Sequence, residues 1–142
     1  VLSAFGLKSP EYDFNEDNDK ARKLSGHGES EHHKNLKEYV AKTPSCIKLP
    51  KTTKKGETEY PLPSGDSLDV SFFAQSGWVA VEVKSSISSE GDIIRGLYQC
   101  VKYQAVMNAV EISQNKLATA RAVLVLGGSM PARLVPLKNL LG

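Results

Sequence analysis

Residues 67–84 read SLDVSFFA over 67–74, QSG over 75–77 and WVAVEVK over 78–84. The two apolar runs are rich in β-branched and aromatic residues, and the short polar segment between them ends in glycine. This pattern is typical of two strands joined by a hairpin turn. The sequence therefore predicts adjacent strands over 67–74 and 78–84.

The second of these strands combines an apolar face with two charged residues. Side chains of a strand alternate between its two faces, so residues two positions apart point the same way. Three valines at alternate positions, 79, 81 and 83, are expected to point into a core. The opposite face is then expected to carry Ala80, Glu82 and Lys84.

The first strand carries one acidic residue, Asp69. By the same alternation, Leu68, Val70 and Phe72 are expected to share one face of the strand, with Asp69 on the other. Pairing of the two strands as a hairpin would bring Asp69 and Glu82 together near one end of the sheet.

Helices and strands are also expected on both sides of this hairpin. Upstream, an apolar stripe predicts a helix over about 28–43, ended by Pro44, and then a short strand over 45–49. Downstream, serines at 88 and 89 can cap a long helix that reaches about residue 114. A buried strand over 120–126 and a short helix over 131–141 follow. The predicted fold is α/β, with a mixed sheet of about four strands flanked by helices in the order α-β-β-β-α-β-α.

Length and composition are those of one globular domain. The 142 residues are enough to bury a core, and 40% are hydrophobic and 24% charged. No run reaches the ~18 apolar residues of a membrane span and no signal peptide is recognisable, so no membrane association and a cytoplasmic location are expected. We expect an irregular arm over 1–25 and a single domain over 26–142.

Charge is unevenly distributed along the chain. The formal net charge is +2, but residues 1–33 carry seven acidic and four basic residues, whereas the remainder carries 14 basic and nine acidic ones. A moderately basic body with acidic residues gathered at one site suits a polyanionic ligand such as nucleic acid.

The three charged residues of the hairpin have a coherent chemistry. Carboxylate oxygens such as those of Asp69 and Glu82 are ligands that Mg²⁺ prefers, and Mg²⁺ also accepts phosphate oxygens. A metal so held polarises a phosphodiester and activates water. Lys84 could orient or deprotonate the attacking water, or stabilise charge in the transition state. The alternative is that the Glu-Val-Lys triplet lies on a solvated face and forms a surface ion pair of little value.

These residues resemble the signature of the PD-(D/E)xK nuclease superfamily, which has the restriction-endonuclease-like fold. In that signature an acid near the end of one strand precedes Glu-x-Lys on the next, and Asp69, Glu82 and Lys84 match it with 12 residues between the acids. Some branches add Gln-x-x-x-Tyr on the following helix, which Gln99 and Tyr103 match. The signature's proline before the acid is replaced by leucine, a common departure. The resemblance covers about residues 26–127 and implies a nuclease that uses Mg²⁺, with Mn²⁺ able to substitute.

Several residues outside the trio are further candidates. Gln99 and Tyr103 share a helix face with Arg95, so we expect them to support the site or to contact nucleic acid. The alternative is a core tyrosine beside a solvated glutamine. Arg95 and Lys102 are candidate phosphate contacts. A basic loop adds three candidate contacts to the nucleic-acid backbone: Lys51, Lys54 and Lys55.

The first helix offers one more candidate ligand. Nucleases of this kind often carry an acid there, and Glu29 fits the helical phase set by Leu36 and Val40. Equally, an acid in a first helical turn is favourable without any metal. The adjacent His32 and His33 point ~100° apart on a helix and are expected on a solvated face.

The predicted function is that of an Mg²⁺-dependent nuclease, with DNA as the first expected substrate. The alternative class is a non-catalytic nucleic-acid-binding or assembly module on the same fold, and a homodimer or a larger assembly is compatible with both. A serine hydrolase has no support. The sequence Gly-Asp-Ser-Leu at 65–68 resembles a lipase motif, but no histidine follows that serine to act as a base.

Overall fold

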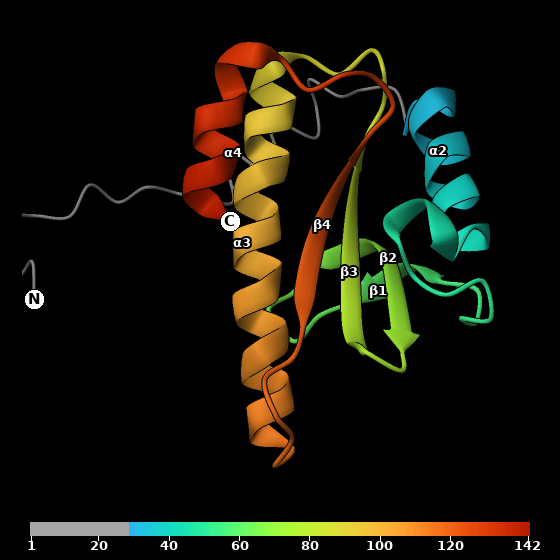
Figure 1. The fold of residues 1–142 in the computed structure, drawn as a ribbon, viewed down its shortest axis with the longest axis vertical. Coiled ribbons are helices and arrows are strands. Elements are labelled where there is room, and N and C mark those ends of the chain that lie inside the picture. Colours follow the sequence, from blue (N-terminus) through green and yellow to red (C-terminus); the bar gives the residue numbers. More distant parts are fainter. Residues whose placement is uncertain (1–28) are drawn as a thin grey trace, which may run out of the picture. The chain divides into compact units, whose positions relative to one another are not determined.

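The computed structural model describes residues 29–142 (Figure 1). Within it, residues 31–142 form one compact unit. The arm expected over 1–25 lies outside the described residues. Within residues 29–142, none of the helices combines the length and the apolar character that a membrane span requires.

A single mixed sheet organises the described part of the chain. Its four strands lie in the order β1 (Glu57–Pro61), β2 (Ser67–Ala74), β3 (Gly77–Lys84) and β4 (Arg121–Leu126). The first three strands are antiparallel, and β4 runs parallel to β3 (Figure 1). The predicted α/β class, the mixed sheet and the hairpin over 67–84 are therefore confirmed. At the hairpin turn Gly77 has a φ of 131°, a value that side-chain-bearing residues rarely adopt.

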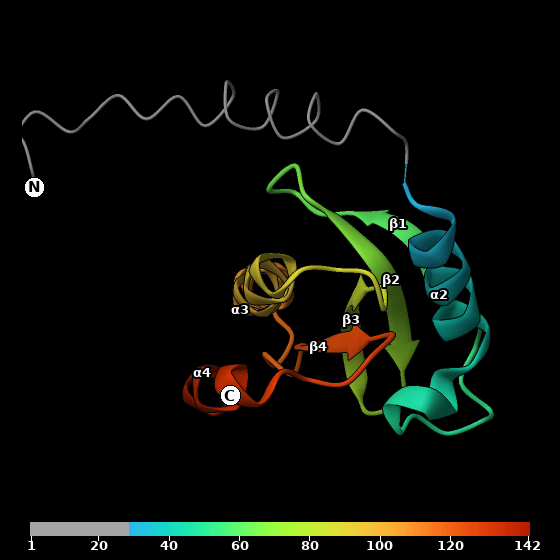
Figure 2. The same ribbon diagram turned by 90° about the horizontal axis from the view of Figure 1, so that it is seen from above.

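Helices cover both faces of the sheet. α2 (Glu31–Lys42) lies on one face and α3 (Glu90–Ser113) on the other (Figure 2). α4 (Val135–Leu141) follows β4 and packs against α3. Two short 3-10 helices, η2 (Pro44–Ile47) and η3 (Ala132–Leu134), complete the order.

The start of the long helix follows directly from its sequence. The Ser89 hydroxyl accepts a hydrogen bond from the backbone amide of Asp92, and the Asp92 carboxylate accepts one from the backbone amide of Ser89. This capping box satisfies two backbone donors, and Glu90 and Asp92 are favourable at the positive end of the helix. Of the two serines considered, Ser89 is the cap.

Two elements upstream of the hairpin differ from the prediction. Residues 45–49 do not form a strand, because Pro44 starts a turn of 3-10 helix that ends with a left-handed residue, Lys48. The outer antiparallel strand is instead β1, which the sequence did not indicate. Four of its five residues are exposed and it ends in proline, as an edge strand can. The first helix begins at Glu31 rather than near residue 28.

The sheet separates two apolar clusters. The cluster on the α2 side includes Val40 from the helix and Val70, Phe72 and Val81 from the sheet. The cluster on the α3 side includes Tyr103 and Met107 from the helix and Leu68, Trp78 and Ala80 from the sheet. The candidate site lies where the two central strands, β2 and β3, emerge from between these clusters.

Candidate active site

A kink in β2 positions Asp69. Leu68 packs into the cluster on the α3 side, whereas Val70 packs into the cluster on the α2 side. The prediction that these two residues share a face with Phe72 is therefore wrong for Leu68. Opposite Asp69 in β1, Glu59 has a φ of 53°, and the paired residues of the β1–β2 ladder lie on either side of these two. The regular alternation is interrupted there, and Asp69 turns toward the end of β3.

The Asp69 carboxylate is held by β3 and by α2. Its Oδ2 accepts a hydrogen bond of 2.8 Å from the backbone amide of Val83 and lies 3.4 Å from Nε2 of His33. The same Nε2 lies 3.0 Å from the carbonyl oxygen of Val83. Both neighbours of Nε2 are acceptors, so a hydrogen on Nε2 fits this arrangement. His33 thus acts as a donor that fixes Asp69 against the end of β3.

Glu82 and Lys84 form a largely buried ion pair beside Asp69. Only 4% of Glu82 is exposed, and Nζ of Lys84 lies 2.8 Å from its Oε1. Burial and, next, the nearby negative charge of Asp69 raise the pKa of Glu82 to about 7, against the opposing effect of Lys84 and His33. Glu82 is therefore a buried carboxyl group beside a second carboxylate, and its charged form is disfavoured there.

Gln99 and Tyr103 extend this site along α3. Nζ of Lys84 donates a hydrogen bond of 3.4 Å to Oε1 of Gln99, and Nε2 of Gln99 donates one of 3.3 Å to the Tyr103 hydroxyl. That hydroxyl lies 3.5 Å from the carbonyl oxygen of Ser67, to which it donates. Burial raises the pKa of Tyr103, so the phenol stays protonated and able to donate. Tyr103 is thus a core residue, and it also fixes one end of a series of hydrogen bonds that runs through Gln99 to Lys84.

Gly96 lets Lys84 reach along α3. A Cβ atom built at Gly96 would lie 2.9 Å from Cδ1 of Leu124 and 3.0 Å from Cε of Lys84. The helix and the sheet approach each other here because the glycine has no side chain. The extended path of the Lys84 side chain depends on this space.

We expect Gly96→Val to destabilise the fold by about 1–3 kcal/mol, because its methyl groups would overpack the contact with Leu124 and displace Lys84. Urea unfolding of the variant measures this loss. The matched control is Gly91→Ala in the first turn of the same helix, where the nearest atom to a new Cβ is 3.7 Å away. The control should be neutral or slightly stabilising. Equal stability of Gly96→Val and the wild type would show that this close approach is not needed.

Of the candidates for nucleic-acid contact, Arg95 and Lys102 lie on α3, and the three lysines lie on the loop that follows α2. Arg95 is exposed on α3, and Lys102 forms an ion pair with Asp66, with 2.8 Å between Nζ and Oδ1. The loop with Lys51, Lys54 and Lys55 is exposed and follows the C-terminal end of α2, whereas His33 lies in the first turn of that helix (Figure 1). A helix of 12 residues is about 18 Å long. The structure therefore does not bring the loop lysines to the carboxylates.

Glu29, the acidic residue expected on the first helix, does not lie on that helix. Glu29 is exposed and precedes α2, which begins at Glu31. The helical phase that linked Glu29 to Leu36 and Val40 therefore does not apply. Of the acidic residues expected to bind a metal, Asp69 and Glu82 are the two that the described structure brings together.

Two α2 residues at the site were missed by sequence reasoning. His33 was expected to be solvated, but it is half-buried against Asp69, while His32 is exposed as expected. Lys37, one turn further on, is only 5% exposed and pairs with the carboxylate of Glu59 at the kink. Both residues share the helix face of Val40, and this phase was the signal that could have identified them.

The carboxylates of the site were predicted to hold a divalent metal ion. Among residues 29–142, no three His, Cys, Asp or Glu side chains converge closely enough to hold a metal ion by themselves. Mg²⁺ does not require such a cage, since it is bound by one or two carboxylates and completes its shell with water and substrate phosphate. The donor set of Asp69 and Glu82 fits that mode of binding.

Comparisons of this chain with models of protein families, with curated proteins and with solved structures give no match. The assignment of a function therefore depends on the geometry of the site.

Proposed function

We propose that this chain is a metal-dependent nuclease that hydrolyses phosphodiester bonds of nucleic acid, most directly DNA, on a restriction-endonuclease-like core. One observation carries the proposal. Two neighbouring strands bring the carboxylates of Asp69 and Glu82 together with the ammonium group of Lys84, which lies 2.8 Å from Glu82 and is hydrogen-bonded to Gln99. A solvated surface ion pair, the main alternative, does not account for a Glu82 that is 4% exposed.

Asp69 and Glu82 are the residues that would hold the metal. A bound Mg²⁺ supplies charge neutralisation and polarisation of the phosphodiester. His33 and the Val83 amide fix the orientation of Asp69. Such outer contacts restrict the rotamer of a ligand and so improve affinity.

Lys84 is the residue proposed to act on the reacting atoms. Its ammonium group donates to Glu82 and to Gln99, so its position is fixed from two sides. From there it orients the attacking water and stabilises the negative charge that develops at phosphorus. Gln99 and Tyr103 serve as positioning residues, because they hold Lys84 through the chain that ends at the carbonyl oxygen of Ser67.

The direct test is a cleavage assay on a panel of nucleic acids. The chain is incubated with plasmid, linear duplex, single-stranded and branched DNA, and with RNA, in Mg²⁺, in Mn²⁺ and in excess chelator. We expect cleavage of at least one DNA substrate with either metal and none with chelator. Binding without cleavage on every substrate would instead identify a non-catalytic nucleic-acid-binding module.

A separate prediction concerns the basic loop and the binding of DNA. We expect reversal of charge at Lys51, Lys54 and Lys55 to weaken DNA binding and to lower the slope of log affinity against log salt by roughly one unit per lost phosphate contact. The metal dependence of cleavage should be unchanged, since the loop lies away from the carboxylates. Fluorescence anisotropy over a range of salt concentrations measures both quantities. Wild-type affinity and slope would remove the loop from the binding surface.

A further inference from the structure

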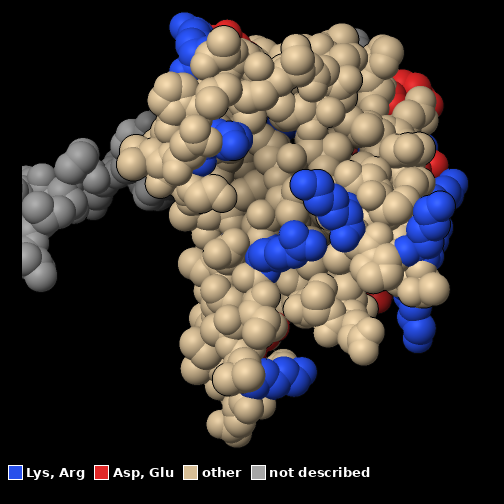
Figure 3. All heavy atoms as spheres, in the orientation of Figure 1, with Lys and Arg blue, Asp and Glu red and all other residues tan. Residues whose placement is uncertain are grey.

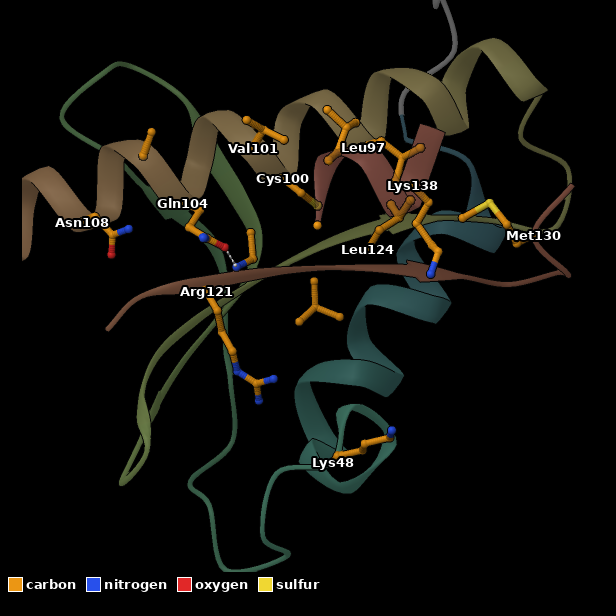
Figure 4. Close-up of a pocket in the computed structure, with 15 residues that line it drawn as sticks. Lys48, Leu97, Cys100, Val101, Gln104, Asn108, Arg121, Leu124, Met130 and Lys138 are labelled. Carbon is orange, nitrogen blue, oxygen red and sulfur yellow. Dashed lines mark hydrogen bonds between the residues drawn. The ribbon is translucent and has the colours of Figure 1, made fainter. Parts of the chain in front are cut away.

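A groove of about 890 Å³ runs along the open edge of the sheet. It is bounded by α3, α4 and β4, and its lining includes Leu97 and Val101 of α3, Leu141 of α4 and Val123 and Leu124 of β4 (Figure 4). In the order of the described strands, β4 has a partner only on the β3 side. We call this feature the β4-edge groove.

The β4-edge groove has the position of a further strand. Val123 packs into the cluster on the α2 side, whereas Leu124 approaches Gly96 of α3, so the lining includes side chains from both faces of β4. A hollow that includes both faces of an edge strand lies beside its backbone. An extended segment placed there would continue the sheet.

The backbone of β4 is oriented for such pairing. The amide of Ala122 donates a hydrogen bond of 3.3 Å to the side-chain oxygen of Gln104 on α3 (the dashed line in Figure 4). This amide therefore points away from β3. Gly127 lies an odd number of positions after Ala122. Its amide donates instead to the carbonyl oxygen of Lys84, on the β3 side of β4. By the alternation of a parallel ladder, the amides of Leu124 and Leu126 also point toward the open edge. They are the donors that an added strand would use.

Charge around the groove is of one sign. Lys48, Arg121 and Lys138 line it, none of them forms an ion pair within residues 29–142, and none of the described lining residues is acidic. Figure 3 shows Lys and Arg side chains toward the middle of the face that carries α4 and β4, with acidic groups mainly toward its margins. An anionic occupant is therefore complementary to this surface.

We propose that the β4-edge groove binds an extended peptide segment of a partner protein, in which apolar and acidic residues alternate, as an added strand beside β4. Apolar residues on one side of the segment would cover the aliphatic lining from α3 and α4, and acidic residues would pair with the three cations. A second copy of this chain is disfavoured, since two-fold pairing of β4 strands would place one positively charged groove against another. Single-stranded nucleic acid is disfavoured because the described lining contains no aromatic side chain on which bases could stack, and a DNA duplex is tested below as a competing occupant.

The test uses a defined probe and the full chain. A fluorescein-labelled peptide of sequence EVDVEVDV is titrated with wild-type protein, with the double variant Arg121→Glu/Lys138→Glu, and with the control variant Lys42→Glu/Lys116→Glu, whose lysines are exposed and do not line the groove. We expect micromolar binding to the wild type and the control, and at least tenfold weaker binding to the groove variant. The basic peptide KVKVKVKV should show the opposite preference.

Amide hydrogen exchange locates the binding. The acidic peptide should slow the exchange of Leu124 and Leu126 in the wild type but not in the groove variant. Absence of peptide binding, or binding that ignores the charge reversal, would overturn the proposal. Protection of these amides that rises with protein concentration alone would indicate a homodimer and would also overturn the proposal. Protection by a DNA duplex in place of the peptide would overturn it as well. None of these outcomes depends on whether the chain cleaves nucleic acid.

Discussion

Replacing Lys84 by methionine should abolish most cleavage while leaving the fold and the binding of substrate in place. Methionine fills the space beside Gly96 but has no ammonium group to donate to Glu82 or Gln99. If that group orients the attacking water and stabilises the phosphorane charge, its loss should lower the cleavage rate by about 10²–10⁴-fold. Single-turnover cleavage at saturating metal and DNA measures the rate, and anisotropy measures the binding.

Two comparisons separate this role from general damage to the site. Asp69→Asn keeps an acceptor for the Val83 amide but loses charge, so its defect should be partly reversed by more Mg²⁺, whereas that of Lys84→Met should not. Lys42→Met removes an exposed lysine whose contact with Glu38 is 4.0 Å, and it should cleave like the wild type. Normal cleavage by Lys84→Met would exclude the mechanism, even on the same fold.

The hairpin and the long helix could be predicted because their signals are local. Alternating valines, a glycine-containing turn and a serine cap each act over a few residues, and the structure has β2, β3 and α3 where these signals lie. β1 could not be found this way. Its exposed, polar residues carry no apolar alternation, and they form a strand because β2 offers an edge with which to pair.

The kink at Asp69 was beyond sequence reasoning for a different reason. Alternation assumes a regular strand, but Glu59 adopts a left-handed conformation in β1 and pairs with Lys37 from α2. The kink therefore involves three separate elements, α2, β1 and β2, and does not follow from the sequence of β2 alone. Regular alternation and the observed kink both leave Asp69 close to Glu82, so this one proximity was expected for a reason that the structure does not bear out. The half-buried position of His33 could have been predicted, because His33 has the same helical phase as the buried residues of α2.

Stability of the metal-free protein should fall as pH rises from about 5 to 8, and Glu82→Gln should remove most of that fall. The pKa of Glu82 is raised from 4.5 to about 7 in the folded protein, chiefly by burial and next by the charge of Asp69. Between these values the folded state holds a proton that the unfolded state has released. Stability is therefore fully present below the unfolded pKa and is lost as pH rises through the folded one, by about 3 kcal/mol in total.

Urea unfolding in excess chelator at a series of pH values measures this loss. Glutamine has the shape of a protonated Glu82 and can still accept from Lys84, so the variant should match the wild type near pH 5 and exceed its stability near pH 8. Glu38→Gln, at an exposed position on α2, serves as the control and should follow the wild-type curve. Adding Mg²⁺ at pH 8 should stabilise the wild type more than Glu82→Gln, because the metal binds the folded carboxylates. Parallel curves of stability against pH for Glu82→Gln and the wild type would contradict this prediction. They would mean that the pKa of Glu82 is not raised in the folded, metal-free protein.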